Sequence, residues 1–374
     1  MTAPIEFRDV ARGRALQAQL DQLLAAHARP ITLLHVCGSH EQAIARYGLR
    51  ARFPANLRVQ MGPGCPVCVT DAPEIDACVA LAERGLRILT YGDMLRVPGQ
   101  RSSLAAARAR GARVEVIYSP TQAVEIARAS AEPVVFFATG FETTAVATAA
   151  VLLAEPPPQL YVLAAHKWVP AAMDVVARSP DSEIEGYLAA GHAATITGYG
   201  LFESFVREHD KPVVVAGFEP LDILAGLVLL VERVIAGQAE LCNAFPRCVS
   251  RDGNRRALAA LWRVFALEDG EWRGIARVPG GELRLRPEFA AHDARLRFAA
   301  ELQEGRREAP AASAGAAPCR CGSIMLGKLT PSDCALFGRE CRPEAPVGAC
   351  MVSTEGACRI WYENGERRLQ ELRT

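Results

Sequence analysis

The sequence lacks any excess of charge. Lysine plus arginine and aspartate plus glutamate each number 42 among 374 residues, so the formal net charge is zero at pH 7. Proteins that bind nucleic acid usually carry a basic patch that shifts this balance. The composition therefore gives no indication of a basic face, and we expect no nucleic-acid partner.

Long apolar runs are also missing. The longest, near residues 145–154 and 223–231, are well short of the roughly 18 residues that a membrane-spanning helix requires. The first residues, MTAPIEFRDVARGRA, lack the apolar core of a secretory signal. With 50% hydrophobic residues and this length, we expect a globular, soluble, cytoplasmic protein of two or three domains, with no membrane partner.

Cysteine is scarce in the first 318 residues, which contain six of the 12 in the chain. The other six crowd into the next 40 residues, as Cys319, Cys321, Cys334, Cys341, Cys350 and Cys358. In a reducing cytoplasm, clustered cysteines bind metal or carry out chemistry more often than they form structural disulfides. This segment therefore predicts a cofactor or redox centre.

Four of these cysteines have a spacing that suits a metal cluster. Cys334, Cys341, Cys350 and Cys358 are separated by six, eight and seven residues, with proline and glycine between them. Structural zinc sites usually take ligands from closely spaced pairs, which this set lacks. Longer loops suit a cuboidal cluster, so we predict a [4Fe–4S] cluster held by these four, with zinc or disulfides as alternatives. Cys319 and Cys321 are either a redox pair or spare ligands.

Short runs rich in valine, isoleucine and leucine alternate with helical patterns from residue 31 to about 236. The runs are ITLLHV, LRVQM, LRILTYG, ARVEVIYS, PVVFFATG, LYVLAAH and PVVVAGF. The alternation is typical of parallel α/β architecture, and it predicts helices over residues 71–83, 120–129, 143–153 and 220–235. Because the alternation ends near residue 240, we predict two Rossmann-like parallel-sheet domains and a cysteine-rich [4Fe–4S] domain. Their predicted ranges are residues 1–125, 126–240 and 241–374.

A first cysteine motif, CGSHE, directly follows the run ITLLHV. In an open parallel sheet this is the carboxyl edge of a strand, where ligands bind. At a helix N-terminus the backbone dipole favours the thiolate of Cys37, and His40 could donate to it or bind the same metal. Glu41 could accept a proton. The alternative is a buried cysteine beside an N-capping Ser39.

A second motif, GPGCPVC, follows LRVQM and precedes a predicted helix. Cys65 and Cys68 form a C-P-x-C pair, which can close a small disulfide ring, and the helix terminus lowers the pKa of one thiol. This combination suits reversible redox chemistry or soft-metal binding. Zinc binding and plain packing are the alternatives.

Other predicted strand ends carry acidic groups. Asp93 follows LRILTYG and Glu142 follows PVVFFATG, and each could be an acid, a base or a hydrogen-bonding partner in the site. For each alone, a helix cap is the simpler interpretation. A lone histidine after an apolar segment, such as His192, is more often structural. We interpret Cys78, Cys242 and Cys248 as inert.

Together these segments resemble the HypD family of [NiFe]-hydrogenase maturation. The matching segments are CGSHE, GPGCPVCVT, YGDMLRVPG, TGFETT, AHKWVPAAM, GFEP and PSDCALFGRECRPEAPVGACMVSTEGAC. They follow the family's order over nearly the whole chain. One departure is Ala190-Gly191-His192-Ala193, where the family more usually has P-G-H-V, so a special role for His192 gains less support.

The resemblance implies two Rossmann-like domains and a C-terminal [4Fe–4S] domain whose ligands match Cys334, Cys341, Cys350 and Cys358. It implies a redox-active scaffold for assembling the Fe(CN)₂CO unit, a transient iron cargo, in complex with a HypC-type chaperone. HypE delivers the cyanide, and the hydrogenase large subunit is an indirect partner.

Matched residue by residue, Cys37 looks like the principal iron-site cysteine, with His40 beside it, and Cys65 and Cys68 look like redox-active thiols. Soft, low-spin iron suits thiolate ligands, and a dithiol supplies two electrons as it closes to a disulfide. We assign Glu142 and Asp93 to proton handling or hydrogen bonding. The protein is then a maturation factor with thiol redox activity rather than a classical turnover enzyme.

Two other functions fit the same residues. One is an autonomous iron–sulfur thiol–disulfide reductase, and the other is a zinc-stabilised binding module without redox activity.

Overall fold

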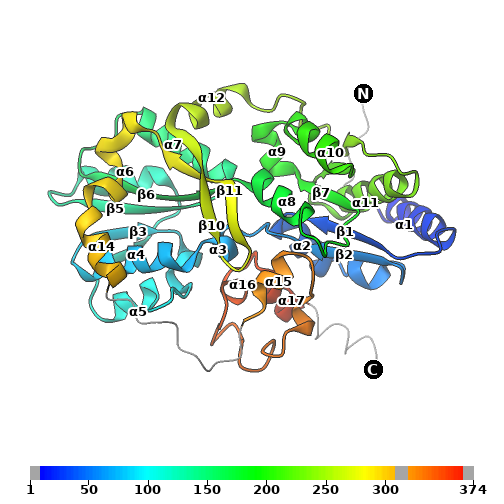
Figure 1. Cartoon of the computed structure of the whole chain (residues 1–374), viewed down its shortest axis with the longest axis horizontal. Helices are drawn as coiled ribbons and strands as arrows, with labels where there is room; N and C mark the ends of the chain where they lie inside the picture. The colour runs from blue at the N-terminus through cyan, green and yellow to red at the C-terminus, as the bar shows by residue number, and fades with distance from the viewer. Residues whose placement is uncertain (1–8, 308–318, 365–374) are drawn as a thin grey trace.

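The computed structural model describes residues 9–307 and 319–364. Two β-sheets with covering helices lie side by side, and a small C-terminal lobe, residues 319–364, packs beneath their junction (Figure 1). The predicted α/β class with two parallel-containing sheets and a cysteine-rich C-terminus is confirmed.

The first sheet, here sheet A, is entirely parallel. Its strand order is β2 (Leu57–Met61), β1 (Ile31–His35), β7 (Gly186–Ala190), β8 (Val213–Ala216), β9 (Leu241–Asn243). Strands β1, β7 and β8 are buried along their whole length, which explains their continuous apolar sequences. The associated helices are α1 (Val10–Ala25), α2 (Gly38–Arg46), η1 (Leu49–Arg52), α9 (Gly191–Thr197), η3 (Tyr199–Phe202), α10 (Glu203–His209) and α11 (Pro220–Ile235).

The second sheet, sheet B, has a parallel part and an antiparallel hairpin. Its strand order is β10 (Phe265–Trp272), β11 (Ala276–Leu285), β6 (Leu160–Lys167), β5 (Val134–Gly140), β3 (Arg87–Thr90), β4 (Val114–Val116). The associated helices are α4 (Ala72–Glu83), η2 (Gly92–Arg96), α5 (Leu104–Ala109), α6 (Pro120–Arg128), α7 (Glu142–Leu153), α12 (Arg255–Val264), η4 (Pro287–His292), α13 (Ala294–Arg297) and α14 (Ala299–Arg307).

The sheets do not follow the predicted linear boundaries. Residues 1–125 contribute β1 and β2 to sheet A but β3 and β4 to sheet B, and residues 126–240 are divided in the same way. The chain crosses between the sheets after β2, through α3 (Pro66–Val69), after β6, through α8 (Val169–Ala177), and again after β9. The proposed boundaries at 125 and 240 are therefore wrong at the level of the sheets, because local periodicity does not report which strands pair.

All seven predicted runs contain strands, and the four predicted helices are present as α4, α6, α7 and α11. The prediction missed β7, β9 and the β10–β11 hairpin. Strand β7 has the sequence GYLAA and β9 only three residues, so neither shows a strong β pattern. The hairpin strand β10 carries several charged residues on its exposed face.

One continuous apolar core joins the two sheets and the lobe. It includes Tyr187 of sheet A, Phe137 of sheet B and Met351 of the lobe. The lobe consists of α15 (Cys321–Met325), η5 (Pro331–Asp333), α16 (Ala349–Val352) and α17 (Ala357–Asn364). Helix α17 packs on α2 and α16 on α3, so the lobe rests on both cysteine motifs.

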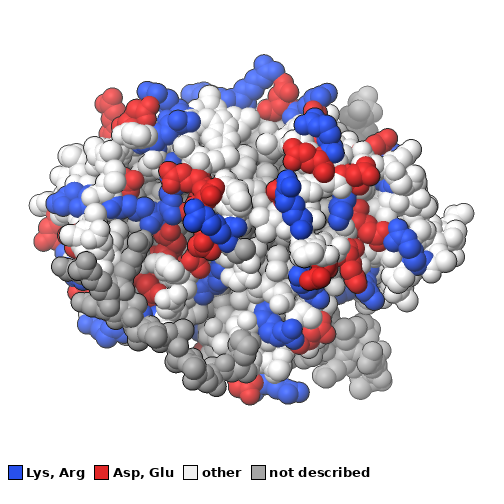
Figure 2. Space-filling model, viewed as in Figure 1, with Lys and Arg blue, Asp and Glu red and all other residues white. Residues whose placement is uncertain are grey.

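The surface visible in Figure 2 carries basic and acidic side chains interspersed with one another. Within the described ranges, no helix combines the length and the apolar character that crossing a membrane would need.

Three glycines allow the backbones at the junction to approach closely. A Cβ on Gly64 would lie 2.1 Å from the backbone nitrogen of Cys37, and one on Gly38 would lie 2.6 Å from the carbonyl oxygen of Glu355. A Cβ on Gly322 of the lobe would lie 2.0 Å from the carbonyl oxygen of Gly274 at the hairpin tip. Such distances are incompatible with any side chain, so these contacts require glycine.

We expect Gly64→Ala to lower the free energy of unfolding by about 2–4 kcal/mol, because a methyl group there must push the two loops apart. The measurement is urea unfolding. Gly92→Ala is the control, since its new Cβ would make only an ordinary contact of 3.5 Å with Val116 and should change stability by less than about 0.5 kcal/mol. Equal effects of the two substitutions would contradict the steric argument.

Candidate cysteine site at the junction of the two sheets

Cys37 lies where β1 ends and α2 begins, at the carboxyl edge of sheet A. Its side chain is buried, with 2% of its surface exposed. Burial raises the pKa of the Cys37 thiol to about 11, and the backbone N–H groups of His40 and Ser39 offset this only in part. The expectation that the helix terminus favours the thiolate is therefore wrong for this structure, because desolvation outweighs the backbone contribution.

Cys65 and Cys68 are joined by a disulfide, with their Cα atoms 5.2 Å apart. Both are buried at the start of α3, where Pro66 occupies the first helical turn and the backbone N–H of Cys68 donates to Cys65 Sγ at 3.1 Å. The loop that carries them is tied to the Cys37 loop, since the N–H of Gly38 donates to the carbonyl of Gly64 at 3.1 Å. The structure thus brings the two predicted cysteine motifs together.

His40 is not the histidine beside the Cys37 sulfur. Its Nε2 faces the carbonyl oxygens of Ala216 and Gly217 at 3.3 and 3.0 Å, and its Nδ1 has no partner among the described residues. Burial and the neighbouring His35 lower the pKa of His40 to about 3, so the ring is neutral. Its ring holds the loop after β8 against α2.

His192 takes the place expected for His40. Its Nδ1 lies 3.9 Å from Cys37 Sγ, and burial lowers the pKa of its imidazole. The sequence interpretation of His192 as structural rests on its being a lone histidine after an apolar segment, and the prediction did not recognise β7 as a strand. Had β7 been recognised, His192 would follow a strand of the same sheet as Cys37 and would fall at the same carboxyl edge.

Glu142 begins α7 at the carboxyl edge of sheet B, and its side chain is 1% exposed. Oε1 accepts a hydrogen bond from the N–H of Val169 at 2.8 Å, whereas Oε2 has no partner among the residues that the structure describes. Burial raises the pKa of Glu142 to about 7. Glu142 lines a cavity of about 20 Å³ together with Gly64 and His192, so it belongs to the junction.

Asp93 holds the C-terminal lobe. Its Oδ2 accepts a hydrogen bond from the hydroxyl of Ser353 at 3.0 Å, and in the same segment Arg96 donates to the carbonyl of Pro343 at 2.9 Å. Burial raises the pKa of Glu355, whose charge acts on Cys37, and the charge of Asp93 adds to this shift. The structure therefore places Asp93 at the rim of the junction.

Glu41 anchors helix α17 of the lobe. It accepts hydrogen bonds from His35 at 2.7 Å, from Arg50 at 2.7 Å and from the indole of Trp361 in α17 at 2.7 Å. Burial alone would raise the pKa of this carboxyl, but the charge of Arg50 and the bond from His35 lower it to about 2. A permanently ionised Glu41 is a fixed anchor and not the proton acceptor that the sequence suggested.

All six cysteines of the lobe line one cavity of about 10 Å³. The predicted ligands Cys334, Cys341, Cys350 and Cys358 are among them, and so are Cys319 and Cys321. Hydrogen bonds from the thiols of Cys319 and Cys350 lower the pKa of Cys321. Six converging soft sulfur donors fit an iron–sulfur cluster and leave more than one choice of four ligands.

Arg273 links the disulfide loop to the lobe. At the tip of the β10–β11 hairpin, its backbone N–H donates to the carbonyl of Val69 at 3.0 Å. Its guanidinium donates to the carbonyls of Thr70 at 2.8 Å and Pro98 at 2.7 Å, and its charge contributes to lowering the pKa of Cys321. Figure 1 shows the hairpin running down the middle of the molecule to this point. No sequence pattern indicated this role.

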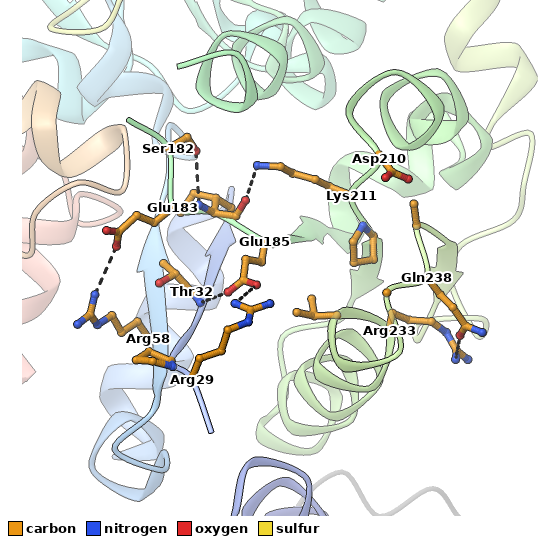
Figure 3. Close-up of a pocket in the computed structure, with 16 residues that line it drawn as sticks. Arg29, Thr32, Arg58, Ser182, Glu183, Glu185, Asp210, Lys211, Arg233 and Gln238 are labelled. Carbon is orange, nitrogen blue, oxygen red and sulfur yellow. Dashed lines mark hydrogen bonds and ion pairs between the residues drawn. The ribbon is translucent and has the colours of Figure 1, made fainter. Parts of the chain in front are cut away.

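An open cavity of about 710 Å³ lies at the opposite edge of sheet A, near the amino ends of β1, β7 and β8 (Figure 3). Its charged lining is largely paired within itself, as in Arg29–Glu185 at 2.5 Å and Arg58–Glu183 at 3.4 Å. None of the predicted site residues lines it.

Comparison with known proteins places nearly the whole chain in one family. The family model described as "HypD: Hydrogenase formation hypA family" matches residues 12–365. The chain is 42% identical to "Hydrogenase maturation factor HypD" of Azotobacter vinelandii, an alignment that covers 97% of both chains. It is 38% identical to the protein of the same name from Escherichia coli, over 93% of each chain.

We expect iodoacetamide to alkylate Cys37 slowly at pH 8 and faster as the pH rises toward 11. A thiol with a pKa near 11 instead of 9.0 has about 100-fold less thiolate at pH 8, and burial slows the reaction further. Exposed Cys248 is the internal control and should react first at every pH. Mass spectrometry of the peptides gives both rates, and equal rates at pH 8 would contradict the desolvation argument.

We expect Arg273→Met to lower the free energy of unfolding by about 1–3 kcal/mol, because carbonyl groups of the disulfide loop lose their donors. Arg273→Lys should recover only part of this loss, since an ammonium cannot reproduce the forked geometry. Urea unfolding measures both. Arg277→Met, which removes a largely exposed arginine of the same hairpin, should be nearly neutral, and a matching loss there would argue against a specific clamp.

Proposed function

Because the chain belongs to the HypD family of hydrogenase formation proteins, we propose that it is the redox-active scaffold on which the Fe(CN)₂CO unit of [NiFe]-hydrogenase is assembled. A role in hydrogenase maturation follows from the family. The finer assignment draws its main support from one observation: Cys37 and the Cys65–Cys68 pair occupy interlocked loops at the carboxyl edge of sheet A.

In this proposal Cys37 is the anchor for iron, with His192 beside it and His40 bracing its helix. A thiol with a raised pKa releases its proton when a soft cation binds, so metal binding and proton release are coupled. A HypC-type chaperone contributes a second cysteine, HypE delivers the cyanide, and the hydrogenase large subunit receives the iron unit from the complex. We place these steps in the cytoplasm.

The Cys65–Cys68 pair supplies the electrons for cyanide release. A thiocyanate-like donor, R–S–CN, reacts with two thiols to give R–SH, cyanide, one proton and a disulfide, so the S–C bond breaks as the S–S bond forms. The described disulfide corresponds to the state after this step. In this proposal Glu142 serves as a hydrogen-bonding group that lines the junction, and Asp93 holds the lobe in register.

The lobe cysteines would hold a [4Fe–4S] cluster, with Cys334, Cys341, Cys350 and Cys358 as the proposed ligands and Cys319 and Cys321 facing the same cavity. When bound, such a cluster supplies electrons one at a time. The chain's own contribution is positional: Arg273 and the contact between Gly274 and Gly322 keep the lobe against the disulfide loop.

The same disulfide also suits the alternative, an autonomous iron–sulfur thiol–disulfide reductase. Burial argues against it, because Cys65 and Cys68 are 1% and 0% exposed and another protein's disulfide cannot reach them directly. Exchange requires in-line access of the attacking thiolate to sulfur. Burial therefore argues against a protein disulfide as the substrate, and the family match favours the scaffold over a reductase of small disulfides.

The test is infrared spectroscopy of the chain purified anaerobically with its small chaperone. We expect cyanide and CO stretches in the wild type, and we expect Cys37→Ala to lose them while keeping the cluster absorbance, because the lobe thiols are untouched. Cys248→Ala, at an exposed cysteine, is the matched control and should keep both signals.

Each other outcome has a defined meaning. Iron should exceed acid-labile sulfide, because the cluster contributes equal numbers of both and the iron unit at Cys37 adds iron alone. Zinc without sulfide would support the binding module instead. Absence of both stretches from an active wild-type complex would overturn the scaffold in favour of the reductase. Loss of the cluster in Cys37→Ala would show that our assignment of Cys37 to the iron site, and of the lobe cysteines alone to the cluster, is wrong.

A further inference from the structure

A small cavity lies next to the loop that carries Cys37. Its volume, about 20 Å³, accommodates one water molecule or the end of one diatomic ligand. Three of its lining residues, Val36, Gly64 and His192, lie next to the proposed iron-binding residue Cys37. Val36 precedes Cys37 in the chain, Gly64 contacts the backbone of Cys37, and His192 Nδ1 lies 3.9 Å from the Cys37 sulfur. The cavity is therefore an extension of the junction.

The opposite wall is contributed by sheet B and by α8. Phe141, Val169 and Pro170 make it largely apolar, and Glu142 provides its one carboxyl group. Oε1 of Glu142 is held by the N–H of Val169, which fixes the side chain, while Oε2 is buried with no partner among the described residues. An unpartnered buried oxygen costs about 1–3 kcal/mol unless something hydrogen-bonds to it.

The surroundings decide what kind of partner this oxygen can take. Burial raises the pKa of Glu142 to about 7, and hydrogen bonds from its own backbone N–H and that of Val169 offset this only in part, so the carboxyl group is about half protonated at neutral pH. A protonated carboxyl group can donate one O–H bond. The complementary ligand is therefore a hydrogen-bond acceptor that is small enough to fit the cavity. The rest of its surface must tolerate contact with apolar side chains.

We propose that this cavity receives the nitrogen end of one cyanide ligand of the iron unit held at Cys37, with Glu142 Oε2–H donating to that nitrogen. This inference rests on the proposed function and adds to it a binding subsite that distinguishes between the ligands. Metal-bound cyanide is an anion with a nitrogen lone pair and accepts a strong hydrogen bond, whereas the oxygen of metal-bound CO is a poor acceptor. Glu142 selects cyanide at this position.

The test compares infrared spectra of the wild type, Glu142→Gln and Glu142→Leu, each purified with the small chaperone. We expect Glu142→Leu to shift one cyanide stretch to lower wavenumber, because the hydrogen bond to nitrogen is lost, with a smaller effect on the CO stretch. Glu142→Gln keeps an N–H donor and should keep a cyanide stretch close to that of the wild type. In D₂O the same stretch should move in the wild type and stay fixed in Glu142→Leu.

A second variant guards against misfolding, since Glu142→Leu also loses the acceptor for Val169. Ala193 lines the cavity, and Ala193→Val fills it without touching the carboxyl group. We expect this variant to perturb the same cyanide stretch.

If both Glu142→Leu and Ala193→Val show cyanide stretches at the wild-type positions, the inference of a cyanide subsite is wrong while the proposed function stands. The partner of Glu142 Oε2 would then be a water molecule. Absence of cyanide stretches from the wild type would overturn the proposed function, and this inference with it.

Discussion

The site depends on a backbone contact that only glycine permits. Cys37 and the Cys65–Cys68 pair follow neighbouring strands, which places them on the same edge of sheet A but leaves the distance between their loops undetermined. Gly64 closes that distance, because its Cα packs on the backbone of Cys37 and its carbonyl accepts from Gly38. Any side chain at residue 64 would separate the proposed iron anchor from the proposed electron source.

Buried charges then fix the position of the surrounding parts. Glu41 of α2 accepts hydrogen bonds from His35, Arg50 and Trp361, and the last of these connects it to helix α17. Lys167 of β6 pairs with Glu282 of the β10–β11 hairpin. Breaking one partner of such a pair leaves an uncompensated buried charge, which is strongly destabilising. These pairs therefore act chiefly as constraints on position: the hairpin must lie where Arg273 reaches the disulfide loop, and the lobe must lie against α2.

The sequence predicted strands and helices well where the apolar pattern was strong. Strand β5, VVFFATG, is buried throughout, and its run of apolar residues is readily recognised as a strand. The sequence GYLAA of β7 has no comparable run of β-branched and aromatic residues. The interpretation of His192 as structural rests on its standing alone after an apolar segment, and the missing strand gave no reason to revise it. The exchange of strands between the sheets was also out of reach, because a linear pattern contains no information on pairing partners and a crossover helix such as α8 resembles any other.

Chemical motifs located the proposed site residues, but the state of each side chain depends on its three-dimensional surroundings. Position at a helix start suggested a thiolate for Cys37, yet the sulfur is buried, and desolvation reverses the direction of the pKa shift. Burial likewise raises the pKa of Glu142 to about 7, so that it is about half protonated at neutral pH, and it keeps His40 uncharged. A junction lined by buried thiol, imidazole and carboxyl groups disfavours isolated charges. In the proposed site a soft cation displaces the Cys37 proton, and the buried thiolate then lies beside a positive charge. An anionic ligand accepts the Glu142 hydrogen bond, which gives the buried carboxyl group a partner.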